Sequence, residues 1–227
     1  MKKRTHQTTP LIFDIYKMLF AHYGEQHWWP SKSGEPWEIV AGAVLTQNCA
    51  WRNVEKALDN LSGLGVSTPH QLLALPPATL QAAIRPAGFF TQKSVYLREA
   101  ARFFIAHEAE FSRPCPAEEL RARRMRLLGV KGVGRETADS ILLYAFKQPV
   151  FVIDAYTRRF AERHLAVPHA ATLPYDALQA VFTGNLPQDV RIYNEYHALI
   201  VRLCKDTCRK QSCACPFAPC NAEGGHV

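Results

Sequence analysis

No segment of this 227-residue chain sustains the alternation of polar and apolar residues that marks a half-buried β-strand, and this is the strongest constraint on its fold. Helix start and stop signals are frequent instead. TPLIFDIYKMLFAHYG has Thr9 as a predicted N-cap, Pro10 in the first turn and Gly24 as the stop. Such signals predict roughly ten or eleven helices, at residues 9–24, 36–48, 51–65, 68–75, 77–84, 91–109, 116–128, 135–146, 154–165, 175–182 and 189–204. We therefore expect an all-α protein, with PVFVID (residues 149–154) as the one candidate strand.

The charge balance favours an anionic partner. The net charge is +7 and the pI is about 9.1, but a basic protein without a polyanionic partner has the same composition. The opening MKKRTHQTTP lacks the apolar core of a signal peptide, and no apolar stretch is long enough to span a bilayer. We expect a cytoplasmic protein with no membrane partner.

Five of the seven cysteines lie in CKDTCRKQSCACPFAPC, residues 204–220, while Cys49 and Cys115 stand alone. In a reducing compartment a cluster this dense predicts a metal site. Four thiolates in a basic loop suit an anionic iron–sulfur cluster, structural zinc is the alternative, and a metal-free reduced tail is the third interpretation.

The stretch LLGVKGVGRETADSILLYAF, residues 127–146, predicts two helices joined by a tight hairpin. Glycines 132 and 134 permit positive φ and leave main-chain amides uncovered beside a helix N-terminus, which is a favourable site for phosphate. Four apolar residues would pack the helices together: Leu127, Leu128, Val130 and Val133. The predicted DNA-binding residues of the hairpin are Lys131, Gly132, Val133, Gly134 and Arg135. This is the form of a helix-hairpin-helix, which holds a DNA backbone without reading its sequence, whereas the alternative is an ordinary glycine-containing loop.

Residues 127–160 resemble the helix-hairpin-helix glycosylases of the endonuclease III superfamily, and the resemblance extends from Trp28 to Cys220. It implies two helical lobes with a DNA-binding cleft between them. Nothing in the sequence suggests an oligomer, so we expect a monomer acting on double-stranded DNA. The implied divisions are a central bundle at 29–147, a second lobe from 1–28 plus 148–203, and a Cys-rich metal loop at 204–220.

The family's characteristic aspartate is matched by Asp154 in VFVIDAYTRR. A carboxylate near C1′ of the sugar stabilises oxocarbenium character, and it can orient or deprotonate the attacking water. An aspartate here also suits an N-cap, and one residue can do both. At the position of Glu136, the family members that also cut the strand have a lysine that forms a Schiff base, which a carboxylate cannot do. The resemblance thus implies base release without efficient lyase activity, while Glu136 is either a direct participant or only an acid favoured by the helix dipole.

The motifs WWP, GAVLTQN, GRETAD and RPAGFFTQK are similar to those of the endonuclease III-like 3-methyladenine DNA glycosylases. In that branch a tryptophan and a later aromatic residue sandwich the flipped base, which implies Trp28 and Trp51 here, with Pro30 lining the pocket and Trp29 beside it. Simple core packing is the other interpretation of these aromatic residues. Two polar residues, Gln47 and Asn48, either wedge the duplex or are merely a helix-terminal polar pair.

The superfamily often ends in Cys-x6-Cys-x2-Cys-x5-Cys, which binds a [4Fe–4S] cluster. This chain has shorter gaps throughout, Cys208-x4-Cys213-x1-Cys215-x4-Cys220, and Cys204 is a spare candidate. The resemblance implies a [4Fe–4S] cluster on these four cysteines, with zinc as the alternative.

These patterns predict a monofunctional DNA glycosylase that excises N3-methyladenine, and other cationic alkylated purines, in base excision repair. One alternative is an endonuclease III-type glycosylase for oxidised or mismatched bases, in which Lys93 or Lys131 would have to serve as the nucleophile. The other is a non-catalytic DNA-binding scaffold.

Overall fold

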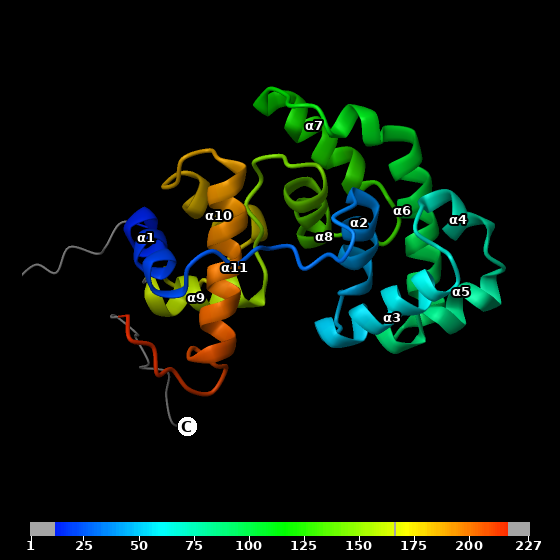
Figure 1. Ribbon diagram of the computed structural model, residues 1–227. Helices are drawn as coiled ribbons and strands as arrows, with labels where there is room; N and C mark the ends of the chain where they lie inside the picture. The colour runs from blue at the N-terminus through cyan, green and yellow to red at the C-terminus, as the bar shows by residue number, and fades with distance from the viewer. Residues whose placement is uncertain (1–11, 166, 218–227) are drawn as a thin grey trace, which may run out of the picture. The chain divides into compact units, whose positions relative to one another are not determined.

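The computed structural model describes residues 12–165 and 167–217, and this part of the chain consists of helices and connecting loops (Figure 1). The helices are α1 (Ile12–Tyr23), α2 (Pro36–Leu45), α3 (Trp51–Gly63), α4 (Pro69–Ala74), α5 (Pro77–Ala83), α6 (Phe90–Phe111), α7 (Ala117–Leu128), α8 (Arg135–Ser140), α9 (Ala155–His164), α10 (Tyr175–Thr183) and α11 (Val190–Asp206), with short helical turns η1 (Arg85–Ala87) and η2 (Ile141–Ala145). The predicted all-α class is confirmed. Thr9 and Pro10 lie outside the described residues, and none of the described helices has the length and apolar character needed to cross a membrane.

The candidate strand at 149–154 is wrong, because the described residues pair there with no other strand. Phe151 and Ile153 are buried, and side chains of α10 satisfy their main-chain groups. The hydroxyl of Tyr175 accepts a hydrogen bond from the Ile153 N–H at 3.1 Å, and the Gln179 amide donates to the Phe151 carbonyl at 2.7 Å. These bonds take the place of a strand ladder.

The chain forms two compact units. We call residues 29–150 the central unit, and residues 1–28 together with 151–227 the terminal unit. The centre of the central unit is α2, which packs on α3, α6 and η2. Every residue of α2 from Ile39 to Leu45 is buried, as expected of a helix that is apolar on all sides.

In the terminal unit, α11 packs against α1 and α9. Its Tyr196 is fully buried among the rings of Phe151, Phe160 and Phe182. The Tyr196 hydroxyl donates to the Ile12 carbonyl at 3.0 Å, so the polar end of this core residue has a partner in α1. This packing fixes α9 and α11 side by side, and both carry candidate site residues.

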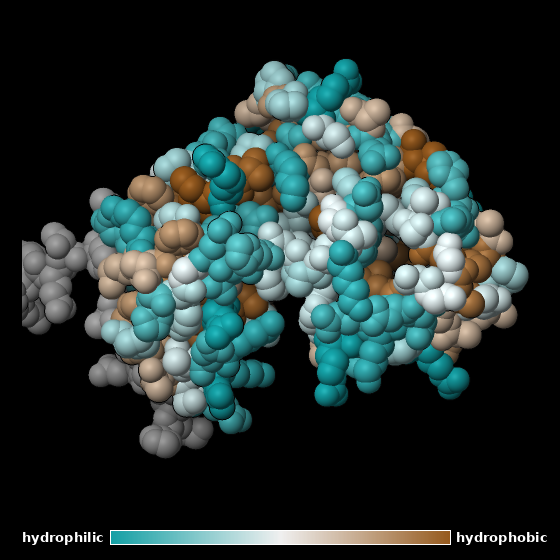
Figure 2. All heavy atoms as spheres, viewed as in Figure 1, coloured by the Kyte–Doolittle hydropathy of each residue, from teal (hydrophilic) through white to brown (hydrophobic). Residues whose placement is uncertain are grey.

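Hydrophilic residues are spread across the surface shown in Figure 2, and strongly hydrophobic ones appear there in small separate groups. Among the described residues the large apolar side chains with the greatest exposure are Phe89, Met125 and Leu64. They come from different parts of the chain, so these three residues do not define one apolar binding patch.

Candidate nucleic-acid interface, active-site residues and metal site

The glycine hairpin connects α7 to α8 over residues 129–134. Gly132 has φ +88°, a conformation that side-chain-bearing residues rarely adopt. Gly134 has φ −88° and ψ 179°, so it does not use the positive φ that a glycine permits. The reason is that Gly134 is the N-cap of α8, and N-cap residues take an extended backbone.

The ring of Tyr96 packs directly against the hairpin at Gly132. A Cβ atom added at Gly132 would lie 2.1 Å from Cγ of Tyr96 on α6, so only glycine fits against this ring. The Gln47 amide donates to the Gly132 carbonyl at 2.8 Å and to the Thr137 hydroxyl at 3.0 Å. Gln47 therefore ties the end of α2 to both sides of the hairpin. Tyr96 was not among the predicted site residues, because no local sequence pattern reveals its contact with Gly132.

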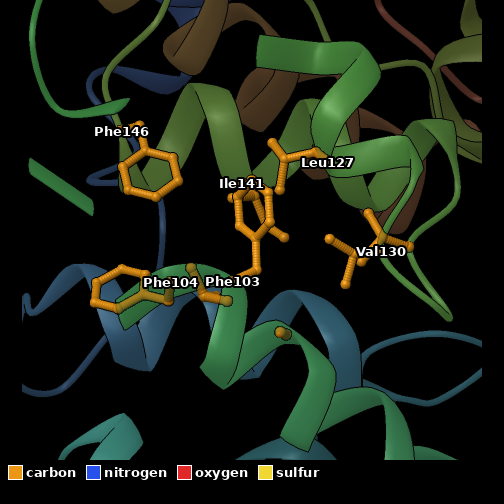
Figure 3. Close-up of a pocket in the computed structure, with 9 residues that line it drawn as sticks. Phe103, Phe104, Leu127, Val130, Ile141 and Phe146 are labelled. Atoms are coloured by element: carbon orange, nitrogen blue, oxygen red, sulfur yellow. The ribbon is translucent and has the colours of Figure 1, made fainter. Parts of the chain in front are cut away.

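Apolar side chains line a small pocket beneath the hairpin (Figure 3). Leu127 from α7 and Val130 from the hairpin face Ile141 and the two phenylalanines of α6, Phe103 and Phe104. Leu127 is 2% exposed, in line with its predicted role of joining the two helices, and Val133, 6% exposed, lines the same space. The hairpin is thus anchored on one side and open on the other.

A buried ion pair joins the helices on either side of the hairpin. Arg124 on α7 donates from Nε to Oδ1 of Asp139 at 2.6 Å and from Nη2 to Oδ2 at 3.0 Å. The Asp139 side chain is fully buried, and that of Arg124 is 17% exposed. A two-bond pair of this kind fixes the angle between α7 and α8.

The open side of the hairpin is exposed and polar. An added Cβ at Gly134 would meet nothing within 4 Å, and Lys131, Arg135 and Glu136 are all exposed. The surface is hollowed here into an open groove, whose lining residues are Gln47, Asn48, Tyr96, Leu128, Gly129, Val130, Lys131, Gly132, Val133, Gly134, Glu136 and Thr137. The structure therefore brings the predicted polar pair, the hairpin and Glu136 to one surface of the central unit.

Asp154 lies at the start of α9 in the terminal unit. Its Oδ1 accepts hydrogen bonds from the Thr157 N–H at 2.7 Å and from the Thr157 hydroxyl at 2.9 Å, so the residue is an N-cap. Its Oδ2 lies 3.5 Å from Nε2 of His197 on α11, and the Asp154 side chain is 14% exposed. Burial alone would raise the pKa of Asp154, but His197 and the two Thr157 donors outweigh it, and the pKa lies below its ordinary value. A carboxylate with one oxygen held by the cap and the other beside an imidazole is fixed in place and ionised at neutral pH.

The tryptophans fall in both units. In the central unit, the rings of Trp29 and Trp51 meet edge to face, with centroids 5.1 Å apart. Both rings lie over Gly42 of α2, where an added Cβ would be 3.4 Å from Trp29 and 3.5 Å from Trp51. Trp28, in the terminal unit, packs its ring against His197 with centroids 6.4 Å apart. Pro30 is exposed.

Lys93 is a structural residue. Its side chain is 2% exposed, and its ammonium donates to the carbonyls of Leu45 and Ala87, each at 2.8 Å. Burial lowers its pKa. These bonds satisfy carbonyl groups at the ends of α2 and η1, so its interpretation as a nucleophile is not supported.

Four potential metal ligands come together in the terminal unit: His164, Cys208, Cys213 and Cys215. The ligand atoms all lie within 4.8 Å of one another. Cys204 is buried outside this group, with its Sγ 3.7 Å from the Tyr156 carbonyl. Cys220, one of the four predicted ligands, lies outside the described residues. His164 is the ligand candidate that sequence reasoning missed.

An α-helical fold with a glycine hairpin of this kind defines a helix-hairpin-helix DNA-binding protein. Comparison with known proteins gives the family: the chain belongs to the HhH-GPD superfamily of base excision DNA repair proteins, whose profile matches residues 41–176.

Relatives cover nearly the whole chain. The chain is 41% identical over 210 residues to MJ1434 of Methanocaldococcus jannaschii, whose name describes it provisionally as a DNA repair glycosylase, covering 91% of this chain and 94% of that protein. It is 26% identical over 206 residues to endonuclease III of Thermotoga maritima, covering 90% and 88%.

Among solved structures, the 3-methyladenine DNA glycosylase MagIII of H. pylori, bound to 1,N6-ethenoadenine, is similar with a TM-score of 0.69 and 27% identity, covering 85% of this chain and 96% of that one. An endonuclease III–DNA covalent intermediate has a TM-score of 0.74 at 21% identity, covering 92% of both chains, which bears on the fold alone. The chain is therefore a DNA glycosylase homologue of the endonuclease III superfamily.

Proposed function

We propose that this protein is a monofunctional DNA glycosylase that excises N3-methyladenine and other cationic alkylated purines from duplex DNA. The observation that carries the proposal is the Asp154 carboxylate, which is ionised, held by its cap and placed beside His197, whose ring packs against Trp28. A fixed negative charge of this kind suits a reaction whose transition state develops positive charge.

The reaction is hydrolysis of the bond between C1′ of the sugar and the damaged base. An N3-methylated adenine is already positively charged, so it departs as a neutral base with the electrons of the broken bond and needs no strong acid. Asp154 stabilises the positive charge that develops on the sugar, and water adds to C1′. The proton of that water passes to Asp154 or to solvent, and the products are free base and an abasic site. His197 acts as a positioning residue that holds Oδ2 of Asp154.

DNA binding is assigned to the hairpin surface of the central unit. The main-chain amides of Gly132 and Gly134 and the start of α8 suit a phosphate oxygen, and Lys131 and Arg135 are exposed beside them. These contacts are with the backbone, so affinity is expected to fall steeply with salt and to depend little on sequence.

Recognition of the base is assigned to indole faces. Each exposed indole face attracts a cationic base by about 0.5–2 kcal/mol. The Trp29–Trp51 pair and Trp28 are the candidates, with Pro30 nearby in the sequence. Stacking there would help offset the few kcal/mol that flipping a nucleotide costs. The similarity to the 3-methyladenine glycosylase MagIII supports this substrate class.

The proposed lack of lyase activity rests on Glu136. Strand cleavage by this class of enzyme needs an amine that forms an imine with the opened sugar, and a carboxylate forms none. Of the two lysines considered as alternative nucleophiles, Lys93 has its ammonium bonded to two carbonyls in the core, and Lys131 is exposed in the hairpin, where it is assigned to DNA binding. We therefore assign Glu136 no imine chemistry, and its position in the first turn of α8 suits the helix dipole.

The proposal is tested with duplex DNA treated with a methylating agent. Released bases are separated by chromatography, and the same DNA is examined for strand breaks before and after hot alkali. We expect release of 3-methyladenine, with breaks only after alkali. Breaks before alkali would overturn the monofunctional assignment. Separate duplexes that contain oxidised or mismatched bases are assayed in the same way, and release of those bases alone would favour the endonuclease III-type alternative.

Binding without release from any of these duplexes would favour the non-catalytic scaffold. To distinguish a glycosylase from a non-catalytic scaffold, DNA affinity is measured on the same preparation by fluorescence anisotropy at several salt concentrations. A scaffold would bind undamaged and methylated duplex equally and with the same salt dependence.

A further inference from the structure

The C-terminal loop folds back on itself beside α9. The backbones of Cys208 and Cys213 pair in an isolated antiparallel β-bridge. The Ala214 N–H donates to the Thr207 carbonyl at 3.0 Å. This turn places the cysteines around His164, the last residue of α9. His164 is 3% exposed, so its imidazole faces the sulfur atoms rather than solvent.

The ligand atoms are close enough together to surround one tetrahedral ion. Bonds of about 2.3 Å to sulfur and 2.0–2.1 Å to nitrogen put neighbouring ligands about 3.6 Å apart for N and S, and about 3.8 Å apart for two S atoms. His164 Nε2 lies 3.4 Å from Cys208 Sγ and 3.6 Å from Cys215 Sγ. Cys213 Sγ lies 3.1 Å from Cys215 Sγ.

A four-iron cluster requires a wider arrangement. Each of its thiolates binds a different iron, so the sulfur atoms stand further apart than the ligands of a single ion. The gaps of this chain, four residues between Cys208 and Cys213 and one between Cys213 and Cys215, give short connections that suit the closer spacing. The residues described here therefore do not fit the [4Fe–4S] cluster that the sequence resemblance implies.

We propose that His164, Cys208, Cys213 and Cys215 bind one zinc ion in a tetrahedral Cys3His site. A structural zinc centre of this type has three thiolate ligands and one neutral imidazole, and it leaves no coordination position open. Cys213 is disulfide-bonded in this structure, so zinc binding requires that this cysteine first be reduced to a thiolate. Cys204 contacts Cys208 and the Tyr156 carbonyl, but it lies outside the group of ligand atoms that are all within 4.8 Å of one another, so it is excluded.

Residues around the ligands complete the site. Arg163 donates to Cys208 Sγ at 3.5 Å and to the carbonyls of Arg209 and Lys210, at 2.7 and 3.0 Å. Arg159 donates to the Cys208 carbonyl at 2.9 Å. Three thiolates around Zn²⁺ leave one net negative charge, which these guanidinium groups balance while they orient the loop.

The zinc site stabilises the helix that presents Asp154. That helix, α9, begins at its N-cap Asp154 and ends at His164, about 15 Å away at the rise of an α-helix. Zinc would fasten the far end of α9 to the C-terminal loop. This consequence rests on the proposed function, but the metal site does not, because metal content is measured without DNA.

The test uses the full-length protein, reduced and purified from medium containing both iron and zinc. We expect one zinc per chain by mass spectrometry, negligible iron and no visible absorption of an iron–sulfur cluster. Cobalt substitution should give the intense visible bands of a tetrahedral site. Four irons per chain with the matching absorption would overturn the proposal.

Variants identify the ligands. His164→Ala should lose stoichiometric zinc, whereas the control Cys204→Ser, at a buried cysteine outside the site, and Cys220→Ser should retain it. His164→Cys keeps a four-ligand set, so cobalt should still bind, with stronger sulfur-to-cobalt charge transfer. An unchanged cobalt spectrum in His164→Cys, or zinc lost in Cys220→Ser and kept in His164→Ala, would show that position 164 is not a ligand.

Discussion

The hairpin glycine offers the sharpest test of the structural argument. Gly132→Ala would force a Cβ-bearing residue to φ +88° and place its methyl 2.1 Å from Cγ of the Tyr96 ring. The positive φ costs about 1–2 kcal/mol. Overpacking against a ring held in α6 costs about 1–3 kcal/mol more. We therefore expect Gly132→Ala to lower the free energy of unfolding by about 2–5 kcal/mol.

The matched control is Gly134→Ala, in the same hairpin. Gly134 has φ −88° and nothing within 4 Å of an added Cβ, so this change should alter the free energy of unfolding by no more than about 0.5 kcal/mol. Urea denaturation followed by circular dichroism measures both variants under one set of conditions.

A double-mutant cycle with Tyr96→Ala separates the two contributions. With the ring removed, Gly132→Ala should cost only the backbone part, about 1–2 kcal/mol, so the two substitutions should couple by about 1–3 kcal/mol. An equal cost of Gly132→Ala with and without the ring would refute the packing argument. A cost within about 0.5 kcal/mol of zero would refute both parts.

Three further predictions follow from the site. Arg124→Ala removes the guanidinium partner of the buried Asp139 carboxylate and should lower the free energy of unfolding, measured by urea denaturation, by about 3–5 kcal/mol. The double variant Arg124→Met with Asp139→Leu leaves no unpaired charge and should lose less, and equal losses would contradict the ion-pair argument. Glu136→Lys places an amine at the start of α8 and should give a borohydride-trapped adduct with DNA, while wild type and Glu136→Gln give none; trapping by wild type would reveal a lyase nucleophile. Because the folded-state pKa of Asp154 lies below its ordinary value of 3.8, its ionisation stabilises the fold above that pH, and this contribution is lost as the pH falls through the lower folded-state pKa. Asp154→Asn should thus lose less stability than wild type on acidification below pH 3.8, and identical acid profiles would contradict the assignment.

The helices were predictable because their signals are local. Proline and capping residues stand close to their starts, and Thr68 forms with Gln71 the reciprocal capping bonds expected of a helix N-terminus. The helical turns η1 and η2 were not predicted as separate elements. The π-helical turn η2 lies inside one continuous apolar run, where the apolar pattern does not distinguish an α-helical turn from the wider π-helical one.

The candidate site was only partly predictable. The hairpin and Asp154 carry local signals, but His164 meets Cys208 across 44 positions, and His197 lies on a different helix from Asp154. Both histidines occupy buried faces of their helices, and a buried imidazole needs a polar partner, so the signal was present without the identity of the partner. The Arg124–Asp139 pair is likewise fixed by the way that α7 and α8 pack, not by sequence spacing.

The most direct test of the account is a single-turnover measurement of 3-methyladenine release by wild type and by Asp154→Asn, with DNA affinity measured on the same preparations. Asparagine keeps the capping oxygen of Asp154 and removes the charge. The account predicts unchanged affinity for methylated duplex and a release rate lower by about 10²- to 10³-fold. A release rate within about threefold of wild type, at equal affinity, would contradict the claim that the charge of Asp154 carries the reaction.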